Sequence, residues 1–187
     1  GQSATREFVV TVKSLAPVAP IAAFTFDADT LGDAQGNYAA GTPTGNRINI
    51  TGSAAQYAEG VSQSALYLDG NSGVRLPDNL ITGHSYSVSL WLNPQELTLF
   101  TTAFFGYAST ESWVSMVPRG HGGVAENTMV WSGTNWYDAG LGSQIPLNSW
   151  SHLVMVVENG DLSVYLNSEL AFEGTGFPDV FSGTTTN

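Results

Sequence analysis

The stretch Asn148–Leu170, NSWSHLVMVVENGDLSVYLNSEL, contains a strand, a polar turn and a second strand in direct succession. Val154 and Val156, with their neighbours, form an apolar, β-branched run that is typical of a strand. The next residues, Glu158–Asp161, have the Asn-Gly composition of a tight turn, and Leu162–Asn167 alternates apolar with polar side chains. The stretch therefore predicts a β-hairpin.

Short strands separated by turn residues precede this hairpin. From Ile21 onward, Gly, Asn, Asp and Ser lie between apolar segments, and no window of useful length has helical periodicity. We expect further strands at Ala22–Phe26, Arg47–Ile50, Ala65–Leu68, Gly73–Leu76, Tyr86–Leu92, Phe100–Tyr107, Trp113–Val117, Thr128–Trp131 and Leu170–Phe172. This pattern predicts an all-β chain in the sandwich or jelly-roll range.

The hairpin resembles one found in laminin-G-like and concanavalin-A-like jelly-roll domains. Family members combine a Trp-His opening, an Asn-Gly or Asp-Gly turn and a Tyr-Val-Asn-Gly strand. The corresponding residues here are Trp150, His152, Tyr165 and Asn167, with Ser168 in place of the usual Gly. Four more blocks resemble the family in the same order: Ala23–Asp27, Asp33–Asn37, Ala65–Gly70 and Tyr86–Pro94. The resemblance implies a two-sheet antiparallel jelly-roll β-sandwich that binds carbohydrate at its surface.

The family's closing strand has the pattern Gly-x-Ile-Asp-Glu-x-x-x-Tyr, and nothing after Phe181 matches it. We therefore expect this jelly roll to lack its final strand. An unpaired edge would then remain at Ala22–Phe26.

The N-terminal residues predict a boundary between domains. Thr5–Lys13, TREFVVTVK, resembles the closing strand of a bacterial immunoglobulin-like domain, so residues 1–14 are expected to end such a domain. Residues 15–20 are rich in proline and predict a linker. Residues 21–187 then form the laminin-G-like domain. A longer secreted or cell-surface bacterial protein is implied, with neighbouring domains and an export signal upstream.

Composition excludes several classes of partner. Sixteen acidic against five basic residues give a net charge of -11, which repels nucleic acid and anionic membranes. No run approaches the roughly 18 apolar residues of a membrane-spanning helix, so membrane insertion is not expected. Cysteine is absent, which rules out disulfides and Cys-based zinc sites.

Oxygen donors are concentrated near the start of the jelly-roll region. Asp27, Asp29, Asp33 and Asn37 lie within eleven residues, and calcium takes six to eight oxygen ligands. Related domains often place calcium where the first loop meets an acid of the last strand, and that acid is missing here. Asx turns in a solvated acidic loop are the alternative.

Aromatic residues mark a candidate sugar site between Tyr107 and Tyr137. Indole and phenol rings stack on the C–H faces of sugars, while polar neighbours bond the hydroxyls. The candidate ligand-binding residues are Trp113, Arg119, Asn127, Trp131, Trp136 and Tyr137. Core packing is the alternative for each Trp, and Trp91 and Trp150 match family core positions. The turn at Gly133–Asn135 favours exposure of the two aromatics that follow it.

Catalytic motifs are missing. There is no E-x-D-x-x-E pair for a retaining glucanase, no H-E-x-x-H zinc motif and no G-x-S-x-G elbow. The first interpretation is a non-catalytic carbohydrate-binding module of a glycoside hydrolase or adhesin. The alternative is a structural or adhesive β-sandwich, a spacer or protein-binding domain without glycan affinity. A hydrolase with an unrecognised catalytic pair is a third, minor interpretation.

Overall fold

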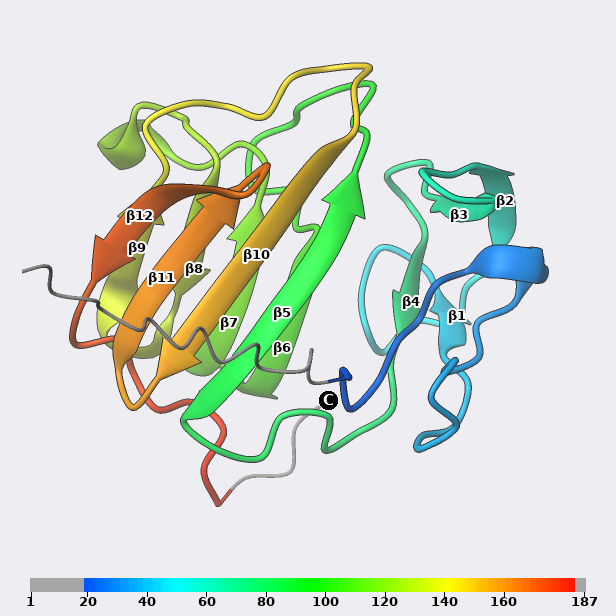
Figure 1. Ribbon diagram of the computed structural model, residues 1–187, viewed down its shortest axis with the longest axis horizontal. Coiled ribbons are helices and arrows are strands. Elements are labelled where there is room, and N and C mark those ends of the chain that lie inside the picture. Colours follow the sequence, from blue (N-terminus) through cyan, green and yellow to red (C-terminus); the bar gives the residue numbers. More distant parts are fainter. Residues whose placement is uncertain (1–18, 184–187) are drawn as a thin grey trace, which may run out of the picture.

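The computed structural model describes residues 19–183, whose strands form two large antiparallel sheets and two small ones. Sheet I has the order β12-β11-β10-β5, and sheet II has the order β6-β7-β8-β9. Figure 1 shows sheet I in front of sheet II, as the two layers of a sandwich. Their strands are β5 (Ser85–Leu92), β6 (Phe104–Ser109), β7 (Ser112–Val117), β8 (Met129–Ser132), β9 (Tyr137–Gly140), β10 (Ser151–Glu158), β11 (Asp161–Leu166) and β12 (Glu169–Gly174). The predicted all-β sandwich is confirmed.

The predicted hairpin is β10 and β11, which pair in antiparallel register with Glu158 opposite Asp161. Between them Asn159 and Gly160 both have positive φ, as a type I′ turn requires. The other side of β10 pairs with β5. The hairpin therefore forms the centre of sheet I.

The core lies between the two sheets. Along β10, buried and half-buried residues alternate, because successive side chains point to opposite faces of a strand. In sheet II, most residues of β7 and β8 are buried. The buried side chains from both sheets are Val114, Met116, Val130, Ala139, Leu153, Met155, Val157, Leu162 and Val164.

A segment after β12 also fills the core, which the sequence did not indicate. Phe177, Val180 and Phe181 are almost fully buried there. The Phe181 ring meets Tyr86 edge to face at 5.4 Å. A Cβ on Gly106 would lie 2.8 Å from Phe181 Cζ, so glycine on β6 leaves space for that ring.

The N-terminal part of the described chain forms the two small sheets, drawn to the right in Figure 1. One pairs β1 (Thr42–Thr44) with β4 (Gly73–Arg75), and the other pairs β2 (Gln56–Glu59) with β3 (Ser64–Tyr67). Three short 3-10 helices complete the elements: η1 (Asp27–Asp29), η2 (Gly122–Val124) and η3 (Thr134–Trp136). Within residues 19–183, no helix is long and apolar enough to cross a membrane.

Two predicted strands are wrong. Ala22–Phe26 is not a strand, because Phe26 has a left-handed backbone and the groups of Ala23 bond to the loop around Asp33. Arg47–Ile50 is a turn in which the Ile50 N–H donates to the Arg47 carbonyl. Strands β1, β2 and β9 were missed. The predicted strand Thr5–Lys13 lies outside the described residues, as do residues 184–187, and the domain boundaries stay predictions.

Candidate functional site

The outer face of sheet II carries a continuous row of residues from four strands. Phe105, Ser115, Trp131 and Asp138 lie opposite one another across β6, β7, β8 and β9. They point away from the core because their neighbours Val114 and Val130 point into it. This row and the rings that contact it form what we call the aromatic face: Phe100, Phe105, Tyr107, Trp113, Ser115, His121, Trp131, Trp136 and Asp138.

Trp131 lies at the centre of the aromatic face. Its ring centroid is 5.0 Å from that of Trp113, 5.6 Å from His121, 5.7 Å from Phe100 and 5.9 Å from Trp136. These distances are typical of edge-to-face and tilted aromatic pairs, which hold each other in a fixed orientation. The centre of the face is therefore a contiguous cluster of rings, already packed together without a ligand.

Glycine helps to assemble this cluster. Gly133 follows β8, and a Cβ there would overlap the Trp113 ring. The indole of Trp113 consequently packs against the backbone where β8 turns into η3.

The rings most open to solvent flank Trp131. Trp136 is 69% exposed and Phe100 is 49% exposed. Both have a left-handed backbone, with φ of 50° and 63°, which is unusual for bulky side chains. Such strain is concentrated at functional sites, where the surrounding structure holds it in place. The two rings provide flat apolar surfaces that are open to solvent, whereas the other rings of the aromatic face are half-buried.

Polar groups border the same rings. His121 precedes η2 and accepts a hydrogen bond from the Gly123 N–H at Nδ1, at 3.0 Å. Its Nε2 lies 3.3 Å from Asp138 Oδ2. Trp131 Nε1 and Ser115 Oγ, on opposite strands of the row, are buried and have no hydrogen-bond partner. The face thus combines ring surfaces with hydrogen-bonding groups.

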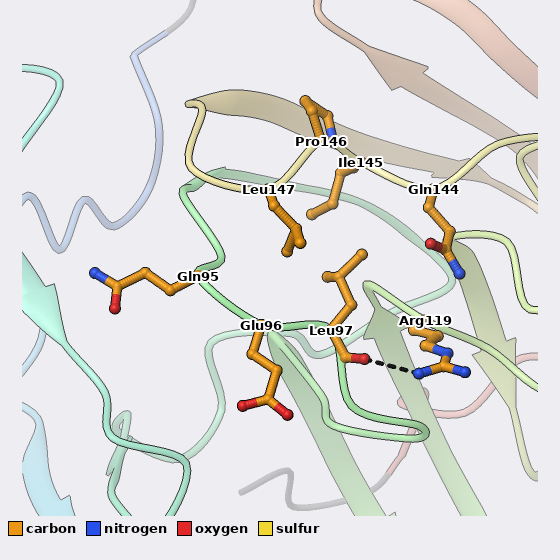
Figure 2. A pocket seen from close by; sticks show the side chains of 8 residues that line it. All are labelled: Gln95, Glu96, Leu97, Arg119, Gln144, Ile145, Pro146 and Leu147. Carbon is orange, nitrogen blue, oxygen red and sulfur yellow. Dashed lines mark hydrogen bonds between the residues drawn. The ribbon is translucent and has the colours of Figure 1, made fainter.

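Arg119 lies at one end of this face, where its guanidinium bonds to the loops that contain Leu97 and Glu126. Its Nε and Nη2 donate to Glu126 Oε2 at 3.1 and 2.7 Å, and its Nη1 donates to the Leu97 carbonyl at 3.0 Å. Gln144 donates to the Glu126 carbonyl at 2.8 Å. Figure 2 shows Arg119 at the rim of a hollow of about 640 Å³ lined by Gln95, Glu96, Leu97, Arg119, Gln144, Ile145, Pro146 and Leu147.

The structure brings three of the six predicted sugar ligands to the aromatic face: Trp113, Trp131 and Trp136. Arg119 is at its end, joined to it by the bond from the Phe100 N–H to the Arg119 carbonyl. Asn127 is half-buried in the loop after η2, where its carbonyl accepts from the Gly120 N–H.

Tyr137 lies on the other side of sheet II. Its ring is 5.1 Å from Phe177 and 6.5 Å from Phe172, and burial raises the pKa of its hydroxyl. The structure therefore places Tyr137 with the core and not with Trp136. Conversely, the expectation that Trp91 packs in the core is wrong. It is 49% exposed on the outer face of sheet I, stacked on His152 at 4.6 Å.

Sequence reasoning missed three residues of this region: Phe100, Phe105 and Asp138. The signal for Phe105 was present, since it lies one β-period from Tyr107 on the strand that pairs with Trp113. Phe100 belongs to a loop and Asp138 to the strand that was not predicted. Neither could be assigned to this face without β9 and the loop conformation.

The predicted calcium ligands are not arranged as one ligand set. Asp33 accepts four backbone hydrogen bonds, and Asn37 Nδ2 donates to the Ile21 carbonyl at 2.9 Å. Asp29 is exposed, whereas Asp27 Oδ1 is buried without a hydrogen-bond partner. In the described part of the chain, no group of three or more Asp, Glu, His or Cys side chains is placed to hold a metal ion. Of the four predicted ligands, Asp27 is the one with a buried oxygen that lacks a hydrogen-bond partner within residues 19–183.

Comparisons with known proteins identify the family of this chain. The family model of the concanavalin A-like lectin/glucanases superfamily matches residues 68–187. A similar solved structure is domain 4 of AbnA, a GH43 extracellular arabinanase from Geobacillus stearothermophilus, in complex with arabinotriose. It is 45% identical to this chain with a TM-score of 0.84, and the match covers 89% of this chain and 81% of that chain. No curated protein matches the sequence.

Proposed function

Because this chain belongs to the concanavalin A-like lectin/glucanases superfamily, we propose that it is a non-catalytic carbohydrate-binding module. Its ligand is an arabinose-containing oligosaccharide, which binds on the aromatic face of sheet II. The arabinotriose complex of the 45% identical domain supports this ligand class.

The observation that carries the proposal is the position of Trp136 and Phe100 on either side of the Trp131 contact network. Both rings are exposed, and the cluster that they contact is already packed together. A sugar that stacks on such rings loses little free energy to reorganisation of the protein, since the surface is already in place. The Asp138 carboxylate can bond hydroxyls beside the stacked ring.

The proposal of a non-catalytic role is supported by the carboxylates of this region. Retaining glycosidases need two carboxyl groups about 5 Å apart across the scissile bond. Glu126 accepts hydrogen bonds from Arg119, and Asp138 lies 3.3 Å from His121 Nε2. These two acids are therefore engaged with separate basic side chains.

We also propose that the module belongs to a larger secreted bacterial protein, a glycoside hydrolase or an adhesin. The origin of the similar domain in an extracellular arabinanase supports this assignment. The competing function is a spacer or protein-binding sandwich, and an absence of glycan affinity would favour it.

Isothermal titration with arabinotriose tests the proposed function. The unaltered domain should bind, and Trp136→Ala should weaken binding by at least about 1 kcal/mol, or roughly fivefold in Kd. Trp91→Ala is the matched control, because Trp91 is a half-exposed indole on the opposite sheet. Equal losses in both variants, or no binding by the unaltered domain, would contradict the assignment.

Calcium at Asp27 is a further part of the proposal, supported by the buried Oδ1 that lacks a partner. Asp29 lies in the same 3-10 helix, while Asp33 and Asn37 shape the adjoining loop. Calcium at about a hundred times its Kd should raise the free energy of unfolding by about 2.7 kcal/mol. Melting curves in calcium and in chelator, at matched ionic strength, should differ for the unaltered domain and coincide for Asp27→Ala. Coinciding curves for both would remove calcium from the account.

A further inference from the structure

We propose that Asp138, oriented by His121, is the residue of the aromatic face that recognises sugar hydroxyls. This inference rests on the proposed function and names the specificity-determining group of the same site. Asp138 lies opposite Trp131 in the register of β8 and β9, two residues after the exposed Trp136. Its side chain is 37% exposed, so its carboxylate is accessible from the side on which the rings are open.

His121 determines which way the carboxylate faces. The Gly123 N–H donates to His121 Nδ1 at 3.0 Å, so Nδ1 acts as an acceptor and the proton of the neutral ring is on Nε2. Nε2 then faces Asp138 Oδ2 at 3.3 Å, an ion-pair distance. The imidazole is itself held against the Trp131 indole, with ring centroids 5.6 Å apart. Backbone, imidazole and carboxylate thus form a chain of contacts beside Trp131.

The carboxylate retains acceptor capacity beyond this contact. An ionised carboxylate offers about four lone-pair sites, and the contact with His121 takes up at most one of them. Within residues 19–183, no hydrogen bond meets the Asp138 side chain. Sugar hydroxyls are donors, and hydrogen bonds to a charged acceptor are roughly twice as strong as neutral ones.

The geometry suits a sugar that carries two adjacent free hydroxyls. An internal pentose of an unbranched chain keeps two hydroxyls after its ring and its two linkages are formed. With the C–H face of that pentose stacked on Trp136, those hydroxyls would lie at the ring's edge, where Asp138 is placed. Asp138 would therefore select for free hydroxyls, and the rings would supply affinity for any sugar face.

The test is isothermal titration with arabinotriose at neutral pH. Asp138→Asn keeps the shape of the side chain and removes its charge, and it should raise Kd by about tenfold or more, with an unchanged melting temperature. Asp161→Asn is the matched control, because Asp161 is an exposed carboxylate at the start of β11 in the opposite sheet. It should leave Kd unchanged.

Two variants of His121 separate orientation of Asp138 from a purely structural role. His121→Gln keeps a donor near the Nε2 position, whereas His121→Asn keeps an acceptor near Nδ1 and loses the donor to Asp138. If His121 orients Asp138, the Gln variant should bind close to normally and the Asn variant should match Asp138→Asn. If His121 only holds the η2 turn, the order should reverse, and the positioning role would be overturned.

The outcomes distinguish this inference from the proposed function. Arabinotriose binding that is lost in Trp136→Ala but unchanged in Asp138→Asn would overturn the role of Asp138 and leave the aromatic face intact. If Asp138→Asn and Asp161→Asn weaken arabinotriose binding equally, the cause is the change in overall charge. That result would also overturn the proposed role of Asp138. An unaltered domain that does not bind arabinotriose would overturn both.

Discussion

Trp136 and Tyr137 are adjacent in the chain and serve different surfaces. Trp136 is 69% exposed and its ring contacts Trp131, whereas the Tyr137 ring packs on Phe177 and Phe172. The chain leaves η3 and enters β9 between the two, and Tyr137 then takes the inward position of the strand. One step along the backbone therefore separates the proposed ligand surface from the core.

Alanine substitutions should show this separation. Tyr137→Ala removes a ring that packs between the sheets and should lower the free energy of unfolding by at least about 2 kcal/mol. Trp136→Ala should change it by less than about 1 kcal/mol, because its ring is mostly in solvent. Urea denaturation measures both values. A larger loss for Trp136 than for Tyr137 would show that the two rings have been assigned to the wrong surfaces.

Tyr86 should make the fold sensitive to alkali. Burial, with a smaller effect from the charge of Asp179, raises the pKa of its hydroxyl above the usual 10, and the hydroxyl has no hydrogen-bond partner. The folded protein then holds a proton that the unfolded chain releases above that pH. Stability is thus fully present below pH 10 and falls as the pH rises beyond it.

Tyr86→Phe should flatten the alkaline decline. At neutral pH it should leave the free energy of unfolding unchanged or raise it by about 1 kcal/mol, because it removes an unsatisfied buried group. Tyr67→Phe is the control, since Tyr67 is 42% exposed. Urea denaturation at neutral and alkaline pH measures the loss of unfolding free energy. If Tyr86→Phe loses as much at alkaline pH as Tyr67→Phe and the unaltered protein do, Tyr86 is not the cause of the decline.

At the scale of the element, one carboxylate organises the first loop. Asp33 accepts hydrogen bonds from the N–H groups of Ala23, Gln35, Asn37 and Tyr38 at 2.8 to 3.1 Å. These bonds favour the ionised form, and the bond to Ala23 has the largest effect in lowering the pKa of Asp33 below 3.8. The loop is therefore fastened by charge-assisted bonds and not by an apolar core.

Amide hydrogen exchange should show that Asp33 protects the four N–H groups that donate to it. Asp33→Ala should remove protection from the four amides while the amides of β10 and β11 keep theirs. Because the folded pKa is depressed, the contribution of Asp33 is present above 3.8 and is lost as the pH falls through the lower folded value. Asp29→Ala is the control from the same region. Unchanged protection of the Ala23 amide in Asp33→Ala would contradict this role.

The sequence predicted elements best where local pattern and tertiary packing agree. The β10–β11 hairpin has β-branched residues, alternation and an Asn-Gly turn, and its register follows from all three. Ala22–Phe26 has the side-chain alternation of a strand but pairs with no strand, because the Ala23 N–H donates to Asp33 in the adjoining loop. Strand β9 has only four residues with Gly140 at its end, too short for a pattern. Asp138 could not be assigned to the site without that strand.

At the scale of the whole molecule, charge favours an uncharged ligand. The net charge of -11 repels acidic polymers, and the proposed arabinose oligosaccharide carries no charge. Stacking and hydrogen bonding to a neutral sugar involve no release of counterions. Binding should therefore depend on ring surfaces and hydroxyl geometry and not on long-range attraction.

Salt should consequently have little effect on affinity. Raising the salt from about 0.1 M to about 1 M shortens the screening length from about 10 Å to about 3 Å, which weakens charge attraction but not stacking. Kd for arabinotriose, measured by titration at both salt concentrations, should agree within about twofold. A steep fall in affinity with salt would indicate that an ionic contact dominates binding.

The indole N–H signals of the five tryptophans test the location of the site most directly. In a two-dimensional ¹⁵N–¹H spectrum, each indole reports on its own surroundings: Trp113, Trp131 and Trp136 at the aromatic face, Trp91 on the opposite sheet, and Trp150 near the start of β10. Titration with arabinotriose should shift the signals of Trp131 and Trp136 most and leave those of Trp91 and Trp150 in place. Shifts confined to Trp91 or Trp150, or no shift in any of the five, would contradict carbohydrate binding on the aromatic face.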